Sequence, residues 1–326
     1  MKYRCLIIGL GQIGMGYDLT LPKNEAIFTH CRALSRHPKF EILGAVDSSL
    51  ERRLVFKEHY GKKAYGDISH AMKEFSPDLV VISSPTDSHY AVVKQVLDQS
   101  KPMAILCEKP LAYELTDAIN IVQSCANLGV RLFVNYHRRS DPGVIEIQKR
   151  IFSGSIARPI KGNVWYSKGL LHNGSHFVNL MQFWLSSVKK HSIISNGRLW
   201  NDEDPEPDVY VEFEQGNIVF SAAWEESFSY YTAEMISPSG RMLYDRGGEL
   251  IQWHSIIDDP KFNGYTILKS DPEIIKNGMN RYQYHVAEQL SLMLEGKEAA
   301  LCSGSEALET QEVIQKILNS RINKKR

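Results

Sequence analysis

The sequence predicts an α/β protein with two domains: a doubly wound Rossmann domain, then an α+β domain with a large, mostly antiparallel sheet. Short apolar runs alternate with helical patterns as far as Tyr136, which is typical of parallel strands joined by crossover helices. After Asp141, strands with every second residue apolar take over, as in an antiparallel sheet with one buried face. Because 326 residues exceed one average domain, we place the first domain at residues 1–137 and the second at residues 138–326.

The expected elements of the first domain follow from local patterns. Apolar runs predict strands, and apolar residues three or four positions apart predict helices. Ser48 and Glu51 have the spacing of a capping box, so a helix is expected from there toward Tyr60, with Gly61 as its end. Expected strands cover residues 4–8, 40–46, 78–83, 103–107 and 131–136, and expected helices cover residues 28–35, 88–99 and 114–127.

The second domain is expected to combine helices with hairpin strands. Val209, Val211 and Phe213 alternate with polar residues, as do the apolar residues of 218–224 beyond a turn at residues 215–217. This alternation predicts an antiparallel hairpin with one buried face. Further strands are expected at residues 162–167 and 232–251, with a turn at 238–240, and helices at residues 144–152, 175–185, 282–294 and 305–319.

The composition is that of an ordinary globular protein without a preference for polyanions. Lys and Arg together number 38, as do Asp and Glu, so the net charge favours neither nucleic acid nor an anionic membrane. The basic end, Lys324 to Arg326, is expected to be a solvated terminus rather than a binding arm. No segment is apolar and long enough to span a bilayer, and glycines interrupt the apolar stretch after Arg4, which argues against a signal peptide.

The five cysteines show neither a C-x-x-C pair nor a metal-ligand spacing. Cys5 and Cys107 lie inside apolar runs, so buried thiols are expected. This pattern suits a reducing compartment, and we expect a cytoplasmic protein without a bound metal.

A glycine-rich turn directly follows the first strand. Gly9, Gly11 and Gly14 form the pattern G-x-G-x-x-G. The first glycine permits a tight turn, the second lets the backbone approach a pyrophosphate, and the third allows a helix to pack closely on the strand. The position after an N-terminal strand predicts a dinucleotide site at this turn, to which Gln12 and Ile13 also contribute.

Asp47 ends the second strand and is the expected partner of the adenosine ribose hydroxyls. An acidic residue is also favoured beside the start of a helix, and the two roles are compatible. A carboxylate at this position repels a 2′-phosphate, so we expect NAD as the cofactor. The positive charges of Arg52 and Arg53 are compatible with a 2′-phosphate, so NADP is the alternative cofactor.

The spacing between the glycine turn and Asp47 departs from the usual pattern. Gly14 and Asp47 are separated by clearly more than the usual ~20 positions. An insertion at residues 17–26 explains the excess. It is expected to cap the cofactor, to reach the substrate, or to be an ordinary surface loop.

Glu108, Lys109 and Pro110 directly follow the apolar run 104–107, which is typical of a buried strand. In an α/β sheet, the carboxyl ends of the strands open onto the crevice that binds ligands. A lysine there, followed by a rigid proline, can present its ammonium group to a cofactor and a substrate. By itself the tripeptide is also compatible with a solvated loop.

Together these motifs resemble the family of glucose–fructose oxidoreductase, inositol dehydrogenase and related sugar dehydrogenases (Gfo/Idh/MocA). The resemblance rests on the segments GLGQIG (9–14), VD (46–47), SPTDSH (84–89), EKPLA (108–112) and VNYHRR (134–139). The third and fourth of these, about 20 positions apart, are far more specific than the glycines alone. The resemblance implies NAD(P)-dependent hydride transfer to or from a sugar or nucleotide sugar. It also implies a second domain that binds substrate and mediates homo-oligomerisation as a dimer or tetramer.

The resemblance further implies roles for individual residues. Lys109, His176 and His172 are the expected catalytic residues, with His176 as the acid/base because the pKa of histidine lies near neutrality. Expected cofactor contacts besides the glycine turn and Asp47 are Ser84, Pro85, His89, Glu108 and Lys109, and expected substrate contacts are Arg138, Tyr166 and Lys168.

One position departs from the family pattern. Where members usually have Asp-x-x-x-His, this chain has His172-Asn173-Gly174-Ser175-His176. A carboxylate at the first position would orient His176 and stabilise its imidazolium form, whereas a neutral His172 can hydrogen-bond but brings no charge. The segment is similar to that of a subgroup associated with bacterial surface-sugar biosynthesis.

Three alternatives remain open. His172 and His176 have the i, i+4 spacing of metal ligands, but Gly174 and Ser175 interrupt the helical face and no third ligand is apparent. The same fold also permits reduction of a non-sugar carbonyl or an imine. The missing carboxylate leaves a cofactor-binding sensor without turnover as a candidate, although the presence of both Lys109 and His176 argues against it.

Overall fold

The computed structural model describes residues 2–22 and 25–322, which form two compact units. The first unit consists of Met1–Ser140 and Asn280–Glu309, and the second of Asp141–Met279 and Thr310–Arg326. The expected boundary after residue 137 lies close to the end of the first segment. The expected second domain is not continuous, however, because the segment 280–309 returns to the first unit and completes its core. The basic end of the chain lies outside the described residues.

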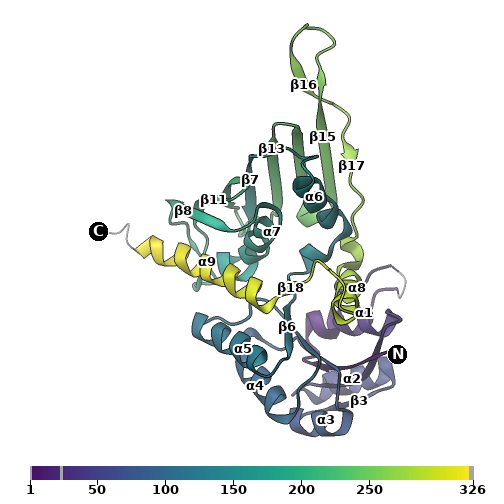
Figure 1. The fold of residues 1–326 in the computed structure, drawn as a ribbon. Helices are drawn as coiled ribbons and strands as arrows, with labels where there is room; N and C mark the ends of the chain where they lie inside the picture. Colours follow the sequence, from purple (N-terminus) through teal and green to yellow (C-terminus); the bar gives the residue numbers. More distant parts are fainter. Residues whose placement is uncertain (1, 23–24, 323–326) are drawn as a thin grey trace. The chain divides into compact units, whose positions relative to one another are not determined.

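The first unit is built on a seven-stranded sheet in the order β18-β6-β5-β4-β1-β2-β3 (Figure 1). This is the doubly wound Rossmann order with one added edge strand, so the predicted fold is confirmed. Every pairing is parallel except that of β18 with β6. The strands are β1 (Tyr3–Ile8), β2 (Phe40–Val46), β3 (Lys63–Tyr65), β4 (Leu79–Ile82), β5 (Ala104–Cys107), β6 (Arg131–Val134) and β18 (Cys302–Ser303).

Helices cover both faces of this sheet, which explains why its central strands are apolar throughout. Apolar residues of α3, α4 and α5 form the core on one face, and those of α1, α2 and α8 form the core on the other face (Figure 1). The helices are α1 (His30–Arg36), α2 (Leu50–Tyr60), α3 (Ile68–Phe75), α4 (His89–Gln99), α5 (Leu115–Asn127) and α8 (Tyr282–Leu294).

The first unit differs from the expected elements in one helix cap and in two elements that the sequence did not predict. The hydroxyl of Ser49, not that of Ser48, accepts a hydrogen bond from the backbone N–H of Arg52 and caps α2. The strand β3 and the helix α3 were not expected from the sequence. β3 is a short edge strand with few apolar residues, but Ile68, Ala71, Met72 and Phe75 have a helical spacing that would have predicted α3.

The second unit is built on a nine-stranded sheet in the order β16-β15-β14-β13-β7-β12-β11-β8, with β17 paired to β15. Its pairings are antiparallel except for that of β7 with β12, which is parallel. The mostly antiparallel sheet is therefore confirmed. The strands are β7 (Ile160–Tyr166), β8 (Val188–Ser195), β11 (Asp208–Phe213), β12 (Gly216–Ala222), β13 (Thr232–Ser237), β14 (Gly240–Asp245), β15 (Leu250–Asp258), β16 (Thr266–Leu268) and β17 (Glu273–Ile274).

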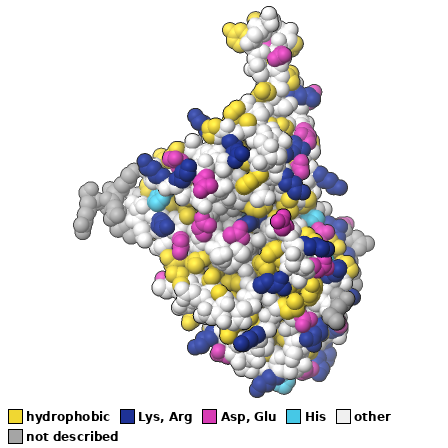
Figure 2. All heavy atoms as spheres, in the orientation of Figure 1, with side chains coloured by type: hydrophobic (Ala, Val, Ile, Leu, Met, Phe, Trp, Pro, Cys, Tyr) yellow, Lys and Arg dark blue, Asp and Glu magenta, His cyan; other side chains and the backbone are white. Residues whose placement is uncertain are grey.

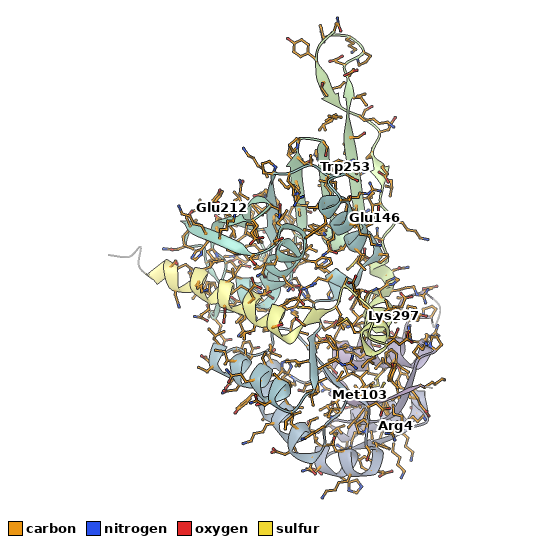
Figure 3. The ribbon with its side chains drawn as sticks, in the orientation of Figure 1. Arg4, Met103, Glu146, Glu212, Trp253 and Lys297 are labelled. Atoms are coloured by element: carbon orange, nitrogen blue, oxygen red, sulfur yellow. The ribbon has the colours of Figure 1, made fainter. Side chains whose placement is uncertain are left out.

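Helices α6 (Pro142–Phe152) and α7 (Ser175–Leu185) belong to the second unit, while α9 (Gly304–Ile322) has residues in both units. The indole N–H of the buried Trp184 donates to the carbonyl of Val144 at 3.0 Å and ties α7 to α6. Glu146 of α6 and Trp253 of β15 lie close together in Figure 3 and line one surface hollow. A small hairpin of β9 (Leu199–Trp200) and β10 (Asp204–Pro205) lies outside the large sheet.

The predicted hairpin of the second unit is shifted by a few residues. β12 already begins at Gly216 and pairs there with Phe213, so residues 214 and 215 form the turn. β12 ends at Ala222, and Trp224 is 71% exposed beyond it. On the face shown in Figure 2, Lys and Arg side chains are interspersed with Asp and Glu, which agrees with the balanced composition.

Candidate cofactor and catalytic sites

The three glycines of the turn after β1 have different surroundings. A Cβ on Gly9 would lie 2.5 Å from the backbone of Ser83, and Gly9 has a positive φ of 101°. A Cβ on Gly14 would lie 2.2 Å from the carbonyl oxygen of Gly9. A Cβ on Gly11 would meet nothing within 4 Å. Gly9 and Gly14 are thus required for packing, whereas the space beside Gly11 is open to a ligand.

Asp47 holds the glycine turn from the end of β2. Its Oδ2 accepts a hydrogen bond from the N–H of Leu10 at 2.7 Å, and its Oδ1 accepts one from the N–H of Ser49 at 2.8 Å. The Nη1 of Arg52 lies 3.7 Å from Oδ2, and the Arg52 side chain is 55% exposed. Asp47 therefore fixes the turn as well as lining the neighbouring cavity, and the exposed Arg52 brings a positive charge beside it.

A cavity of about 600 Å³ opens at the carboxyl ends of β1, β2 and β4. It lies where doubly wound sheets bind their ligands. Seven residues expected in cofactor binding line it: Gly9, Gly11, Gln12, Ile13, Asp47, Ser84 and Pro85. Tyr17, from the insertion considered as a cofactor cap, and Arg52, considered for NADP, line it as well. Further lining residues had no expected role: Ser48, Gly66, Ile68, Ser83, Ser88 and Val92.

His89 does not line this cavity, contrary to its expected role in cofactor binding. The side chain is fully buried. Its Nδ1 lies 3.1 Å from the carbonyl oxygen of Leu111, and its Nε2 lies 3.0 Å from that of Ser84. His89 thus joins the segment after β4 to the segment after β5.

Glu108 is also buried, in a hydrogen-bonded network rather than on the cavity wall. Its Oε1 accepts hydrogen bonds from Nε2 of His30 at 2.8 Å and from Nδ2 of Asn135 at 2.6 Å. Its Oε2 accepts one from the N–H of Lys109 at 3.3 Å. Burial raises the pKa of Glu108, but these hydrogen bonds and nearby positive charges outweigh burial and hold the pKa below its usual value.

Lys109 is half-buried at the carboxyl end of β5. Its positive charge contributes to the lowered pKa of Glu108. Burial, together with the charges of Arg138, Lys109 and His30, holds the pKa of His137 well below its usual value, so His137 is neutral at pH 7. The ring of His137 lies 4.5 Å from that of Tyr282. The charge of Lys109 thus acts on both Glu108 and His137. The half-buried Arg138 directly follows His137 in the chain.

The insertion at residues 17–26 folds back on α1, as far as it is described; Lys23 and Asn24 lie outside the described residues. The buried Asp18 accepts hydrogen bonds from the N–H groups of Phe28 and Thr29 at 2.7 and 2.9 Å. The guanidinium group of Arg32 donates to the carbonyls of Asp18, Leu21 and Ala26. Tyr17 lines the cavity and is 57% exposed. The cofactor-capping role of this segment stays a prediction.

In the second unit, the histidine segment 169–176 connects β7 to α7. Gly169–Gly174 form a short π-helical turn, and Ser175 begins α7. His176 is 5% exposed in the first turn of α7, and the ring of His172 stacks on Trp200 at 4.8 Å between centroids. Lys168 precedes this segment in a left-handed conformation, with its Nζ 3.9 Å from Glu225.

Tyr166 was expected to contact the substrate, and the structure does not support this role. Its side chain is fully buried, and its hydroxyl donates to the carbonyl of Pro207 at 2.7 Å. Ile160 and Val164, on the same side of β7, are buried as well, so Tyr166 belongs to the core. The alternation of β7 would have predicted this orientation.

No group of three or more His, Cys, Asp or Glu side chains within the described residues could hold a metal ion. The described part of the chain also contains no helix that is long and apolar enough to cross a membrane.

The strand order, the glycine turn, Asp47 and the cavity between them define a Rossmann domain of the dinucleotide-binding class. Residues 3–136 match the Gfo/Idh/MocA family, described as an oxidoreductase family with an NAD-binding Rossmann fold. Residues 3–136 therefore form an NAD-binding Rossmann domain of the type that this family describes. The resemblance noted from the sequence motifs is thereby confirmed.

Two curated relatives and one solved structure illustrate the similarity. An inositol 2-dehydrogenase from Rubrobacter xylanophilus is 28% identical over 54% of this chain and 49% of its own length. Another from Mycolicibacterium smegmatis is 35% identical over 31% of this chain and 29% of its own. The chain thus spans half or less of these relatives. The WlbA dehydrogenase from Bordetella pertussis, solved with NADH and UDP-GlcNAcA, has the same fold, with a TM-score of 0.75, 16% identity, and coverage of 98% and 97% of the two chains.

Proposed function

We propose that the chain is an NAD-dependent dehydrogenase that interconverts a CH–OH group and a carbonyl on a sugar or nucleotide sugar. The observation that carries this proposal is Lys109, half-buried at the carboxyl end of β5 in a domain of an NAD-binding oxidoreductase family. Relatives named inositol 2-dehydrogenases support the polyol or sugar class. A structural neighbour solved with UDP-GlcNAcA motivates the inclusion of nucleotide sugars. A role in surface-glycan biosynthesis is proposed from the resemblance of residues 172–176.

NAD supplies the hydride acceptor when it is bound. The residues of the glycine turn, Asp47, Ser84 and Pro85 would hold it, since they line the cavity. Lys109 donates a hydrogen bond to the reacting oxygen of the substrate and stabilises the charge that develops there. Glu108 and His89 act indirectly in this scheme, because both side chains are buried and hydrogen-bonded to other segments of the first unit.

His176 is the acid/base of the proposed reaction, and it accepts the proton from the substrate hydroxyl. His172 assists it as a hydrogen-bonding neighbour. Arg138 and Lys168 remain the proposed substrate contacts, since both side chains are partly exposed. Tyr166 is removed from this set because it is buried.

The cofactor role of the glycine turn is tested by replacing Gly11 with alanine. The added Cβ meets no protein atom within 4 Å, so the variant should fold normally. The methyl group would occupy the space for the pyrophosphate, and we expect NAD affinity to fall at least tenfold, which corresponds to about 1.4 kcal/mol. Isothermal titration calorimetry measures this. Lys101→Ala is the control, because Lys101 is exposed and does not line the cavity; equal loss in both variants would contradict the assignment.

The preferred cofactor is tested in the same titration. Asp47 lines the cavity and favours NAD, while the exposed Arg52 beside it can meet a 2′-phosphate. We expect tighter binding of NAD than of NADP, and we expect Arg52→Ala to weaken NADP binding alone.

The reaction is tested by incubating the protein and NAD or NADP with a panel of polyols, sugars and nucleotide sugars, and following the absorbance of the reduced cofactor. We expect turnover with at least one member of the panel. Binding of NAD without turnover across the panel would favour a cofactor-binding sensor. A second panel pairs imines and non-sugar carbonyls with NADH or NADPH, and turnover only in this panel would replace the substrate class.

The cellular setting and assembly are parts of the same proposal. All five cysteines are buried free thiols, which supports a reducing compartment such as the cytoplasm. Homo-oligomerisation through the second unit is proposed from the family resemblance, and light scattering of the purified protein tests it.

A further inference from the structure

The second unit contains a pair of carboxylates that touch the histidine segment 169–176 from a distant part of the chain. We propose that Asp204, assisted by Glu206, is a positioning residue that holds this segment in its active conformation. The inference rests on the proposed dehydrogenase function. Asp204 belongs to the β9–β10 hairpin and takes no part in any motif recognised in the sequence.

The first contact is with the backbone of the histidine segment. Asp204 Oδ2 accepts a hydrogen bond from the N–H of His172 at 2.7 Å, and its Oδ1 accepts one from the N–H of Leu171 at 3.1 Å. Glu206 is fully buried, and its Oε1 accepts one from the N–H of Gly169 at 3.1 Å. The two carboxylates therefore satisfy N–H groups at the start of a helical turn that lack intrahelical partners.

The second observation is the tight fit at Gly169. A Cβ at this position would lie 2.0 Å from Oδ2 of Asp204, so only glycine lets the carboxylate approach. Lys168 and Gly169 both have left-handed backbones, with φ of 67° and 75°, and this conformation is uncommon for a lysine. Such a reversal persists when surrounding contacts fix it, and the carboxylates of Asp204 and Glu206 supply those contacts.

The same hairpin also contacts the side chain of His172. Trp200 pairs with Asp204 across the hairpin and stacks on the imidazole of His172 at 4.8 Å and 26°. Arg198 anchors the hairpin, since its Nε donates to Oε2 of Glu206 at 2.7 Å. The hairpin thus fixes both the backbone and the ring of His172.

Asp204 brings a carboxylate to the backbone of residue 172, the position at which the family pattern has an aspartate side chain. This carboxylate comes from 32 positions further along the chain, which explains why no local motif reveals it.

Asp204→Asn tests the inference in the full-length protein. The amide preserves the size of the side chain but removes the charge and one acceptor. We expect hydrogen exchange of residues 169–176 to accelerate and kcat to fall on the order of 10- to 100-fold, with the KM for NAD unchanged. Asp202→Asn is the matched control, because Asp202 is exposed in the same hairpin and should retain full activity.

The outcomes separate this inference from the function on which it rests. Accelerated exchange with normal kcat would reduce Asp204 to a structural residue, and unchanged exchange would show that it does not hold the segment. Either result overturns the inference. An inactive wild-type protein would instead reject the proposed function itself.

Discussion

Replacing Lys109 with alanine is expected to reduce kcat on the order of 10³-fold while leaving the Kd for NAD unchanged. The ammonium group is half-buried at the end of β5, where it can polarise a substrate oxygen. Lys109 does not line the cavity that holds the glycine turn and Asp47, so its removal should spare cofactor binding. Initial rates with the substrate found in the panel, and calorimetric titration with NAD, measure the two quantities.

Lys101→Ala is the matched control for this experiment. Lys101 is exposed before β5, at the opposite end of the same strand, so its removal should change neither quantity. Lys109→Arg should also lose most activity, because a guanidinium differs from an ammonium in shape and cannot release a proton. Near-normal turnover in Lys109→Ala would remove the lysine from the mechanism.

The motifs that the sequence revealed are those whose residues lie close together in the chain. The glycine turn needs only Gly9 to Gly14, and its consequences are local: a tight turn, a helix contact and an open side. Lys109 was identified in the same way, from the strand that immediately precedes it. Position in a strand–turn pattern therefore predicted the edge of the sheet at which the site lies.

The supporting contacts could not be predicted because they join residues far apart in the sequence. His30 meets Glu108 across 78 positions, and Asp204 meets His172 across 32. Each such pair depends on sheet order and side-chain direction, which a single sequence does not specify. The burial of His89 and Glu108 has the same origin, since both follow the expected strand ends but turn inward to other segments.

The roles of His30 and Glu108 lead to a prediction about stability. Glu108→Gln places an amide N–H₂ group against donors, either the N–H of Lys109 or the side chains of His30 and Asn135. A buried donor is then left without an acceptor, and we expect the free energy of unfolding to fall by about 2 kcal/mol. Urea unfolding followed by circular dichroism measures this. Glu114→Gln is the matched control, since Glu114 is exposed and its side chain makes no capping hydrogen bond in α5.

The pH dependence of that difference provides the sharper test. The pKa of Glu108 is lower in the folded protein than its ordinary value of 4.5, so the carboxylate stabilises the fold fully above pH ~4.5. This contribution is lost as the pH falls through the lowered pKa, because the folded protein must then take up a proton against its hydrogen bonds. The stability advantage of the wild-type protein over Glu108→Gln should therefore shrink in urea titrations below pH ~4.5. A difference that grew with acidity below that pH would mean that Glu108 is held protonated in the fold.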